Sequence, residues 1–315
     1  MHSGFVTIIG RPNAGKSTLL NALVGEKLAI VTHKPQTTRN RICGIVNLKA
    51  PQRAKSRPAG QIIFVDTPGI HKPVDALNRR MMQEVHDAVE GCDLLLLIVD
   101  AAQPFGSGDE FALELVKRSK LRAFLLLNKI DLVEKGKLLP IIERYSAMHS
   151  FAEVIPISAA KKDGLDLLLN KVVASLPEGP QYFPADQITD QPERFITAEL
   201  IREQVLVLTQ QEVPYSSSVI VERFEESDKL LKIAAVICVE RDGQKAIVIG
   251  RQGAMLKEIG TRARLAIERL LNKKVFLELF VKVRKGWRES RQFVDDLDWR
   301  KQLQSLGGRN PKPSD

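Results

Sequence analysis

Residues 5–25 read FVTIIGRPNAGKSTLLNALVG: an apolar run, a loop bracketed by glycines and the start of a helical pattern. The middle of this stretch, Gly10–Ser17, matches GxxxxGK[ST], the loop whose backbone N–H groups surround nucleotide phosphates. In such a loop Lys16 supplies a cation to the phosphates, and Ser17 offers a hydroxyl to Mg²⁺. The stretch therefore predicts a nucleotide-binding domain that begins with the first strand of the chain.

Further apolar runs of strand length follow the loop, with helical patterns between several of them. Continuous apolar runs are typical of strands that are covered on both faces, and their alternation with helices implies a mainly parallel sheet. We therefore expect an α/β, doubly wound P-loop domain. The expected strands are 5–10, 61–66, 93–100, 123–129 and 153–158, and the expected helices include 16–25, 79–90, 108–119 and 163–175.

Three more motifs lie at the ends of later strands, where a doubly wound sheet binds its ligands. They are DTPG at Asp66–Gly69, NKID at Asn128–Asp131 and SAA at Ser158–Ala160. An Asp in NKID can accept hydrogen bonds from guanine N1 and N2, and the backbone of SAA can donate to guanine O6. Each motif alone is an ordinary turn or helix cap, but their order after a P-loop indicates a guanine-nucleotide site.

Together these motifs resemble the guanine-nucleotide set of the translation-factor-related GTPases. The resemblance implies that Thr38, in PQTTRNRI, completes the Mg²⁺ shell with Ser17 and Asp66, with Thr37 as the competitor for that role. It also implies GTP hydrolysis that depends on Lys16, Thr38 and Gly69. The predicted GTP-binding residues are Gly10, Arg11, Pro12, Asn13, Ala14, Gly15, Lys16, Ser17, Thr18, Asp66, Thr67, Pro68, Gly69, Ile70, Asn128, Lys129, Ile130, Asp131, Ser158 and Ala159.

The residue after DTPG departs from the commonest GTPase pattern. Many GTPases place a glutamine there to orient the attacking water, but this chain has Ile70, which has no hydrogen-bonding group. We therefore expect slow intrinsic hydrolysis that needs another water-orienting group or an activating partner. Asn13 is a candidate for recruiting K⁺, as in relatives with asparagine at this loop position; the alternative is that it only supports the loop.

A change in composition and hydrophobic periodicity near residue 177 predicts the end of the first domain. The stretch PEGPQYFPADQITDQP, 177–192, holds four prolines and no sustained periodicity, which is typical of a linker. The predicted organisation is a GTP-binding domain at 1–178, a linker at 179–191, an RNA-binding domain at 192–291, and a C-terminal helix with a disordered tail at 292–315.

The second domain reads as a small α+β domain. We expect a helix at 192–210, strands at 216–225 and 229–240, a hairpin turn at Arg241-Asp242-Gly243, and a third strand at 244–250. A helix at 254–271, a strand at 274–284 and a short helix complete it. The loop Gly250-Arg251-Gln252-Gly253 between strand and helix lacks the Lys-Ser pair of a second P-loop.

The charge around this Gly-x-x-Gly loop favours a polymeric anion as its ligand. Residues 241–291 hold fourteen Lys or Arg against five Asp or Glu, an excess of nine positive charges, which equals that of the whole chain. A basic face around such a loop is expected for binding single-stranded RNA; the alternative is a tight turn beside a solvated basic helix. The predicted RNA-binding residues are Gly250, Arg251, Gln252, Gly253, Lys257, Arg262, Lys282, Arg284 and Lys285.

With its element order and charge, the second domain resembles a type II KH domain, and the whole chain resembles the Era family of GTPases. The matching segments include GRPNAGKSTLLNALVG, DTPGIHKP, VPYSSSVIVERF and LELFVKVRKGWRES. The resemblance implies binding near the 3′ region of 16S ribosomal RNA, a switch role in assembly of the 30S subunit, a monomer, and peripheral association with an anionic inner membrane. The alternative is an RNA chaperone or a membrane-surface tether in which GTP is mainly a conformational ligand.

Composition adds three expectations. Cys43, Cys92 and Cys238 form no CxxC pair, which favours buried structural thiols in a reducing compartment. No apolar run approaches the length of a membrane span, and the N-terminus lacks a signal-peptide pattern, so we expect a cytoplasmic protein. Trp287, Phe293 and Trp299 could stack on bases or pack internally, and the basic stretch 48–60 could contact RNA or be a solvated loop.

Overall fold

The computed structural model describes residues 1–34, 37–49, 58–70, 75–210, 213–227 and 230–300. The chain divides into two compact units, one formed by most of residues 1–191 and the other centred on residues 192–300. This division falls where the second domain was predicted to start. Within the described residues, no helix is both long enough and apolar enough to cross a membrane.

The first unit is built on a six-stranded sheet with the order β2-β3-β1-β4-β5-β6. Five of its strands are parallel, and β2 at the edge runs antiparallel to β3. The mainly parallel sheet predicted from the apolar runs is confirmed. The strands are β1 (His2–Ile9), β2 (Ile42–Leu48), β3 (Gly60–Asp66), β4 (Leu94–Asp100), β5 (Ala123–Asn128) and β6 (Glu153–Pro156).

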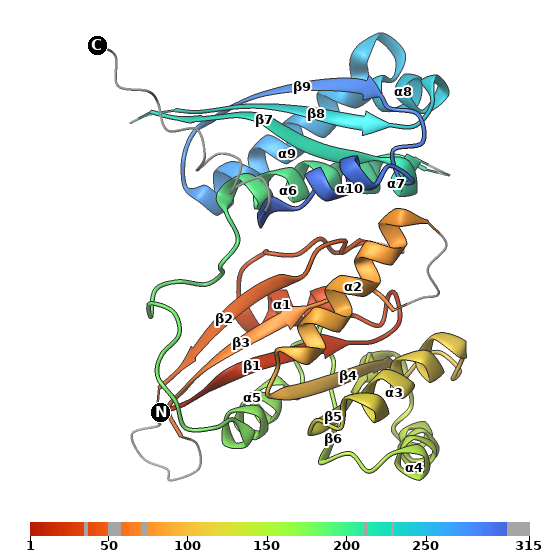
Figure 1. Cartoon of the computed structure of the whole chain (residues 1–315), viewed down its shortest axis with the longest axis vertical. Coiled ribbons are helices and arrows are strands. Elements are labelled where there is room, and N and C mark those ends of the chain that lie inside the picture. Colours follow the sequence, from red (N-terminus) through yellow and green to blue (C-terminus); the bar gives the residue numbers. More distant parts are fainter. Residues whose placement is uncertain (35–36, 50–57, 71–74, 211–212, 228–229, 301–315) are drawn as a thin grey trace. The chain divides into compact units, whose positions relative to one another are not determined.

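Helices cover both faces of this sheet, as Figure 1 shows. Alternate residues of β4 point to opposite faces, so Leu95, Leu97 and Val99 meet the face formed by α2, α3 and α4, where they join a buried apolar cluster. Helices α1 and α5 pack on the other face. The helices are α1 (Lys16–Val24), α2 (Ala76–Glu90), α3 (Ser107–Ser119), α4 (Leu138–Met148) and α5 (Leu165–Ser175), with 3₁₀ turns η1 (Ile130–Leu132) and η2 (Lys135–Lys137) before α4.

The predicted linker 179–191 packs along the edge of the first unit. The buried side chain of Gln61, on β3, donates to the Phe183 carbonyl at 2.8 Å and accepts from the N–H groups of Tyr182 and Phe183 at 2.8 and 2.9 Å. Further along, Ile45 N–H donates to the Ile188 carbonyl. A segment with backbone hydrogen bonds of this kind is part of the folded unit rather than a free connection.

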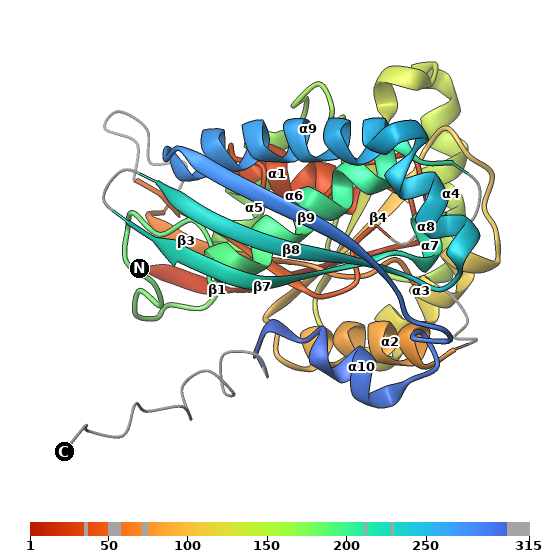
Figure 2. The ribbon, with the colours of Figure 1, turned by 90° about the horizontal axis from the view of Figure 1, so that it is seen from above.

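The second unit has a three-stranded sheet, β7-β8-β9, with α6 and α9 on one face (Figures 1 and 2). β7 and β8 are antiparallel, whereas β8 and β9 are parallel. Leu279 of β9 points toward α9, because a Cβ added at Gly260 would lie 3.4 Å from its side chain. The elements are α6 (Glu193–Leu208), α7 (Val213–Ser216), β7 (Ser218–Glu226), β8 (Leu231–Val239), α8 (Asp242–Ile249), η3 (Arg251–Gly253), α9 (Ala254–Leu271), β9 (Val275–Val283) and α10 (Arg291–Asp296).

The predicted hairpin at Arg241-Asp242-Gly243, and the strand expected after it at 244–250, are wrong. Residues Asp242–Ile249 form helix α8, and the Gly-x-x-Gly loop therefore joins two helices. Gln244 accepts from the N–H of Arg241 at 3.1 Å, which satisfies a free donor at the helix start. The apolar run AIVI fits a buried strand or one face of a short helix equally well, so periodicity alone cannot separate the two.

The aromatic residues near the C-terminus pack internally. Trp287 is 1% exposed, donates from Nε1 to the Ser216 carbonyl at 2.9 Å, and lies edge-on to Phe293. Trp299 lies beside Phe195 of α6. The three cysteines are buried, as predicted, and none of them forms a disulfide within the described part of the chain. The basic stretch at 50–57 and the predicted tail at 301–315 lie outside the described residues.

Replacing Trp287 tests its packing role. We expect Trp287→Ala to lower the free energy of unfolding of the second unit by about 3–5 kcal/mol, because a large buried ring leaves a cavity. Trp287→Phe should cost about 1 kcal/mol through the lost hydrogen bond to Ser216. Both tryptophans of the chain lie in this unit, so urea unfolding followed by Trp299 fluorescence measures both variants.

The half-exposed Phe276 on β9 is the matched aromatic control. Phe276→Ala should cost well below the Trp287→Ala value. Equal losses from the two alanine variants would contradict the assignment of Trp287 to the core.

Candidate functional site

The P-loop between β1 and α1 requires glycine at two positions, because a side chain at either of them would collide with a neighbouring strand. A Cβ added at Gly10 would lie 2.3 Å from the Ile98 carbonyl oxygen. At Gly15 the φ is +103°, and a Cβ would lie 2.2 Å from Asn128 Nδ2. The loop is thus held against β4 and β5, and its backbone N–H groups open at the carboxyl edge of the sheet.

Lys16 is buried under this loop. Its Nζ donates to the carbonyl oxygens of Gly10 and Arg11 at 3.0 and 3.1 Å. Burial lowers the pKa of Lys16 to about 8, although the nearby Asp66 carboxylate acts in the opposite direction. The lysine is therefore an under-solvated cation, for which phosphate oxygens are suitable partners.

Ser17, Thr38 and Asp66 converge on one point. The Ser17 hydroxyl donates to Asp66 Oδ2 at 2.6 Å, the Thr38 hydroxyl donates to the same oxygen at 3.3 Å, and the two hydroxyls are 2.8 Å apart. Of the two candidate threonines, Thr38 joins this cluster through its hydroxyl, and it is buried there.

This cluster fits a Mg²⁺ ion. Two hydroxyls and a carboxylate are the hard oxygen ligands that Mg²⁺ prefers. The second oxygen of Asp66, Oδ1, is buried with no hydrogen-bond partner among the described residues. Burial raises the pKa of Asp66 to about 6, against the opposing effects of Lys16 and the two hydroxyls. A buried carboxylate with an unsatisfied oxygen is a site that a divalent cation would stabilise.

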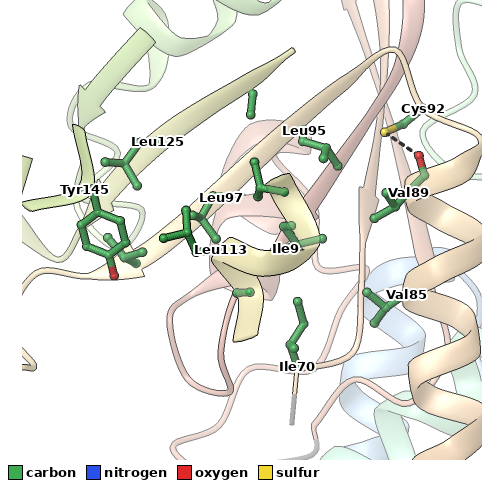
Figure 3. Close-up of a cluster of buried hydrophobic side chains, with 14 of the residues drawn as sticks. Ile9, Ile70, Val85, Val89, Cys92, Leu95, Leu97, Leu113, Leu125 and Tyr145 are labelled. Carbon is green, nitrogen blue, oxygen red and sulfur yellow. Dashed lines mark hydrogen bonds between the residues drawn. The ribbon is translucent and has the colours of Figure 1, made fainter. Parts of the chain in front are cut away.

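The DTPG segment forms a hydrogen bond to the P-loop and packs closely against it. The N–H of Ile70 donates to the Gly10 carbonyl at 3.2 Å, and a Cβ at Gly69 would lie 2.9 Å from the Cα of Pro12. The Ile70 side chain is fully buried in the apolar cluster with Ile9 and Val85 (Figure 3). Ile70 therefore packs in the core in this structure and offers nothing to a nucleophilic water. Thr67 is also inward, because its hydroxyl donates to the Ile8 carbonyl.

The base-recognition loops are joined by Asn128. Its side chain donates to the Ala14 carbonyl at 2.8 Å and accepts from the Ala159 N–H at 3.0 Å. Asp131 accepts from the Ser158 hydroxyl at 2.6 Å and is otherwise exposed, so its carboxylate can face guanine N1 and N2. The structure thus brings the P-loop, NKID and SAA motifs together at one edge.

Several residues of this site were missed by the sequence analysis. Asp100 ends β4 and forms an ion pair with Lys129 at 2.7 Å; a polar residue at the end of a strand was the signal that could have found it. Asp109 of α3 pairs with Arg11 at 3.0 Å. The Asn21 amide holds the backbone of Leu28 and Ala29, at the start of the segment that leads to Thr38. Neither Asp109 nor Asn21 is marked by a motif.

In the second unit, the Gly-x-x-Gly loop depends on left-handed backbone conformations. Gly250 has a φ of +73°, and a Cβ there would lie 2.6 Å from Met255 Cβ. Gly253 has a φ of +79° and precedes α9, and Gln252 between them also has a positive φ. Arg251 and Lys257 are exposed beside the loop, and neither has a carboxylate partner among the described residues. They are the cations of this loop that are available to a phosphate backbone.

Other predicted RNA-binding residues lie elsewhere. Lys282 is on the face of the sheet opposite Leu279 and α9, where it pairs with Glu222 at 3.1 Å. The Arg284 guanidinium lies 4.4 Å from the centroid of the Phe293 ring. Arg262 is on α9 and pairs with Glu258 at 2.6 Å. The structure therefore does not gather the nine predicted residues on one surface.

Comparisons with known proteins find relatives of both units. A family model described as 50S ribosome-binding GTPase matches residues 5–129, and a KH domain model matches residues 212–288. GTPase Era of Syntrophus aciditrophicus (strain SB) is 52% identical over 299 residues, which cover 94% of this chain and 95% of the relative. GTPase Era of Geobacter metallireducens is 50% identical and covers 94% and 97%. The chain belongs to the Era family of GTPases.

Two solved Era structures are similar to this chain over the same length. One is a variant of Aquifex aeolicus Era bound to GDP.AlF4-, with a TM-score of 0.88, 39% identity, and coverage of 94% of this chain and 98% of that chain. The other is Era in complex with MgGDPNP and nucleotides 1506–1542 of 16S ribosomal RNA, with a TM-score of 0.87 and the same identity and coverage.

As an Era GTPase, the chain hydrolyses GTP with the residues at the carboxyl edge of its larger sheet. Lys16 and the P-loop N–H groups are the groups that would bind the phosphates, Asp131 and the Ala159 backbone are those that would contact the guanine, and Ser17, Thr38 and Asp66 are the residues that would hold Mg²⁺. When bound, Mg²⁺ neutralises charge on the β- and γ-phosphates. The buried hydroxyl of Thr38 ties the segment before β2 to this point, so that segment can respond to the nucleotide state.

Removing the charge of Asp66 should raise the stability of the chain without metal and weaken its binding of GDP in the presence of Mg²⁺. The pKa of Asp66 is raised from 3.8 to about 6, so the ionised carboxylate destabilises the metal-free fold above pH 6 and does so progressively less as pH falls toward 4. We expect Asp66→Asn to stabilise the metal-free chain at pH 7.5 by on the order of 2 kcal/mol and to lose this gain near pH 4. Urea unfolding in EDTA at both pH values measures it.

The same variant should bind GDP more weakly in the presence of Mg²⁺, because the metal loses its charged ligand; fluorescence of a labelled GDP measures this. Asp87→Asn, at an exposed position of α2, is the matched control and should change neither quantity. Destabilisation of the metal-free chain by Asp66→Asn at pH 7.5 would contradict this account of the buried carboxylate.

Proposed function

We propose that this Era GTPase binds single-stranded RNA through its KH unit, that its target is the 3′ region of 16S ribosomal RNA, and that GTP binding and hydrolysis switch this interaction during assembly of the 30S subunit. The observation that carries the proposal is the Gly250–Gly253 loop between α8 and α9. Its left-handed glycines let a sugar-phosphate chain approach closely, and Arg251 and Lys257 are free to contact phosphates. The Era complex with nucleotides 1506–1542 supports this choice of target.

RNA binding can be tested with a 37-nucleotide RNA of the sequence 1506–1542 and a scrambled RNA of the same composition. We expect tighter binding of the native sequence, and a loss of affinity of about five- to tenfold for Arg251→Ala, with a salt slope smaller by about 1 because one phosphate contact is removed. Lys232→Ala is the matched control, since Lys232 is an exposed cation on the sheet face away from α9. Equal losses from both variants would contradict a specific role of the loop.

The switch proposal predicts that the two sites are coupled. The native RNA should change the GTP affinity or the hydrolysis rate of the full chain, and by linkage GTP should change the RNA affinity by the same factor. If RNA changes neither quantity, the switch fails while the RNA site stands. If Lys16→Ala abolishes hydrolysis and subunit maturation stays normal, the alternative role as an RNA chaperone or membrane-surface tether is supported instead.

We also propose that K⁺ assists hydrolysis through Asn13. Ile70 is buried and orients no water, so charge stabilisation must come from another group. Asn13 is exposed at the P-loop, and its Nδ2 donates to the His33 carbonyl at 2.8 Å. Among the described residues no donor reaches its Oδ1, which leaves that oxygen available to a cation.

The K⁺ proposal predicts faster hydrolysis in KCl than in NaCl, by about tenfold or more, as expected for a cation that replaces an arginine finger. Asn13→Ala should remove the difference and retain GDP binding. Equal wild-type rates in the two salts would remove K⁺ from the mechanism. A GTPase-activating partner, a monomeric state, and a cytoplasmic location with peripheral association with an anionic inner membrane stay predictions from the family resemblance.

A further inference from the structure

A cavity lies beside the nucleotide site, between the loop that follows β4 and helix α4. Its volume is about 470 Å³, which is in the range of sites for small organic ligands. One wall is the segment 99–105, and the other runs from Leu132 to Tyr145. Two of its lining residues, Asp100 and Asp109, pair with Lys129 and Arg11 of the nucleotide site, and none of the others is among the phosphate, metal or guanine positions described above.

The interior of the cavity combines apolar walls with two buried polar groups. Phe105, Val133 and Ile141 line it, together with Leu132, which is 67% exposed and offers an uncovered apolar surface. The polar groups are Asp109 and Tyr145, both almost fully buried. Tyr145 lies at the edge of the apolar cluster of the first unit (Figure 3), and burial and the nearby Asp109 carboxylate raise the pKa of its hydroxyl.

Counted together with Lys129 and Arg11, which pair with two of its carboxylates from outside the cavity, the charges of the lining leave one cation in excess. Each carboxylate of the lining is ion-paired: Asp100 with Lys129 at 2.7 Å, Asp109 with Arg11 at 3.0 Å, and Glu134 with Lys137 at 3.5 Å. Arg144 has no carboxylate partner among the described residues. Its guanidinium lies 5.9 Å from the centroid of the Phe105 ring, so it sits over the apolar wall. A ligand with one negative charge and an apolar body matches both features.

Several hydrogen bonds and ion pairs connect the cavity to the nucleotide site. Asp109 holds the side chain of Arg11 in the P-loop. On the other side, the N–H of Ala101 donates to the Asn128 carbonyl at 2.9 Å, and the N–H of Leu132 donates to the Lys129 carbonyl at 3.0 Å. Ordering the cavity walls therefore orders the P-loop and the NKID loop.

From this arrangement we propose that the cavity between residues 99–109 and 132–145 is a regulatory site for a small carboxylate with an aromatic or branched apolar body, and that its occupancy is linked to nucleotide affinity. The carboxylate pairs with Arg144, and the apolar body covers Leu132, Ile141 and Phe105. Because the ligand restrains walls that also hold Arg11 and Asn128, ligand and GDP bind with positive cooperativity. All of its lining residues lie in the first unit.

The test uses the full chain and 3-phenylpropionate as the probe, with the neutral 3-phenylpropionamide as its matched control. Calorimetry should show about tenfold tighter binding of the carboxylate than of the amide, and Arg144→Ala should remove this preference, because a charge-assisted hydrogen bond is lost. Arg118→Ala removes an exposed cation of α3 outside the cavity and should have no effect. Equal binding of acid and amide, or an unchanged preference in Arg144→Ala, would overturn the site.

Linkage is measured by the dissociation rate of a labelled GDP. Saturating 3-phenylpropionate should slow dissociation by about fivefold, and Asp109→Asn, which weakens the hold on Arg11, should reduce this effect while the probe still binds. An unchanged GDP dissociation rate in the presence of bound probe would overturn the regulatory role.

N-acetylphenylalanine distinguishes two sources of the same chemistry. Tighter binding of this compound than of 3-phenylpropionate supports the carboxyl terminus of a protein segment as the natural ligand, and the reverse order supports a free carboxylate. Failure of both compounds to bind overturns the proposal and leaves the GTPase and RNA assignments untouched.

Discussion

One buried amide, that of Asn128, holds the nucleotide site of this protein together. Its two polar atoms bond to the Ala14 carbonyl and the Ala159 N–H, so it joins three loops that are far apart in the sequence. Gly15 has to be a glycine because this amide occupies the space of a side chain. The amide is buried, so loss of either bond would leave an unsatisfied polar group in the interior, which is costly. The parallel sheet makes this arrangement possible, because it brings the ends of β1 and β5 to the same edge.

The nucleotide site holds two buried charges whose desolvation costs stability. The pKa of Lys16 is lowered and that of Asp66 is raised, in both cases mainly by burial. Each shift means that the charged form is poorly solvated in the fold without its ligand. A triphosphate and a divalent cation supply the missing partners, so nucleotide binding relieves a strain that the fold itself creates. Sites of this kind are expected to be less stable than their surroundings when they are empty.

The two units handle phosphate groups with related backbone chemistry and different side chains. Both use glycines with positive φ to bring backbone N–H groups to a surface in front of a helix, at Gly15 before α1 and at Gly253 before α9. The first loop adds a buried lysine and a metal cluster, which suit a compact, highly charged nucleotide. The second has only exposed cations, Arg251 and Lys257, which suit a chain of single phosphates. The two loops therefore share a glycine turn before a helix, and the side chains around each turn determine which ligand it suits.

The sequence alone determined the P-loop, the guanine motifs, the mainly parallel sheet and the start of the second domain, because each depends on local residue types or on long apolar runs. It was wrong at residues 242–249, where a short apolar run fits a strand and a helix equally; in the folded chain this segment is a helix that buries Gln244 and Val248, four residues apart. It left Thr37 and Thr38 as alternatives, since neighbouring residues differ only in the direction of their side chains.

Only the tertiary structure showed the Gln61 anchor of residues 182–183, the Arg11–Asp109–Tyr145 connection and the separation of Lys282 from the RNA loop. These features are contacts between residues that are distant in the chain, and no local pattern encodes which distant partner a polar side chain will meet.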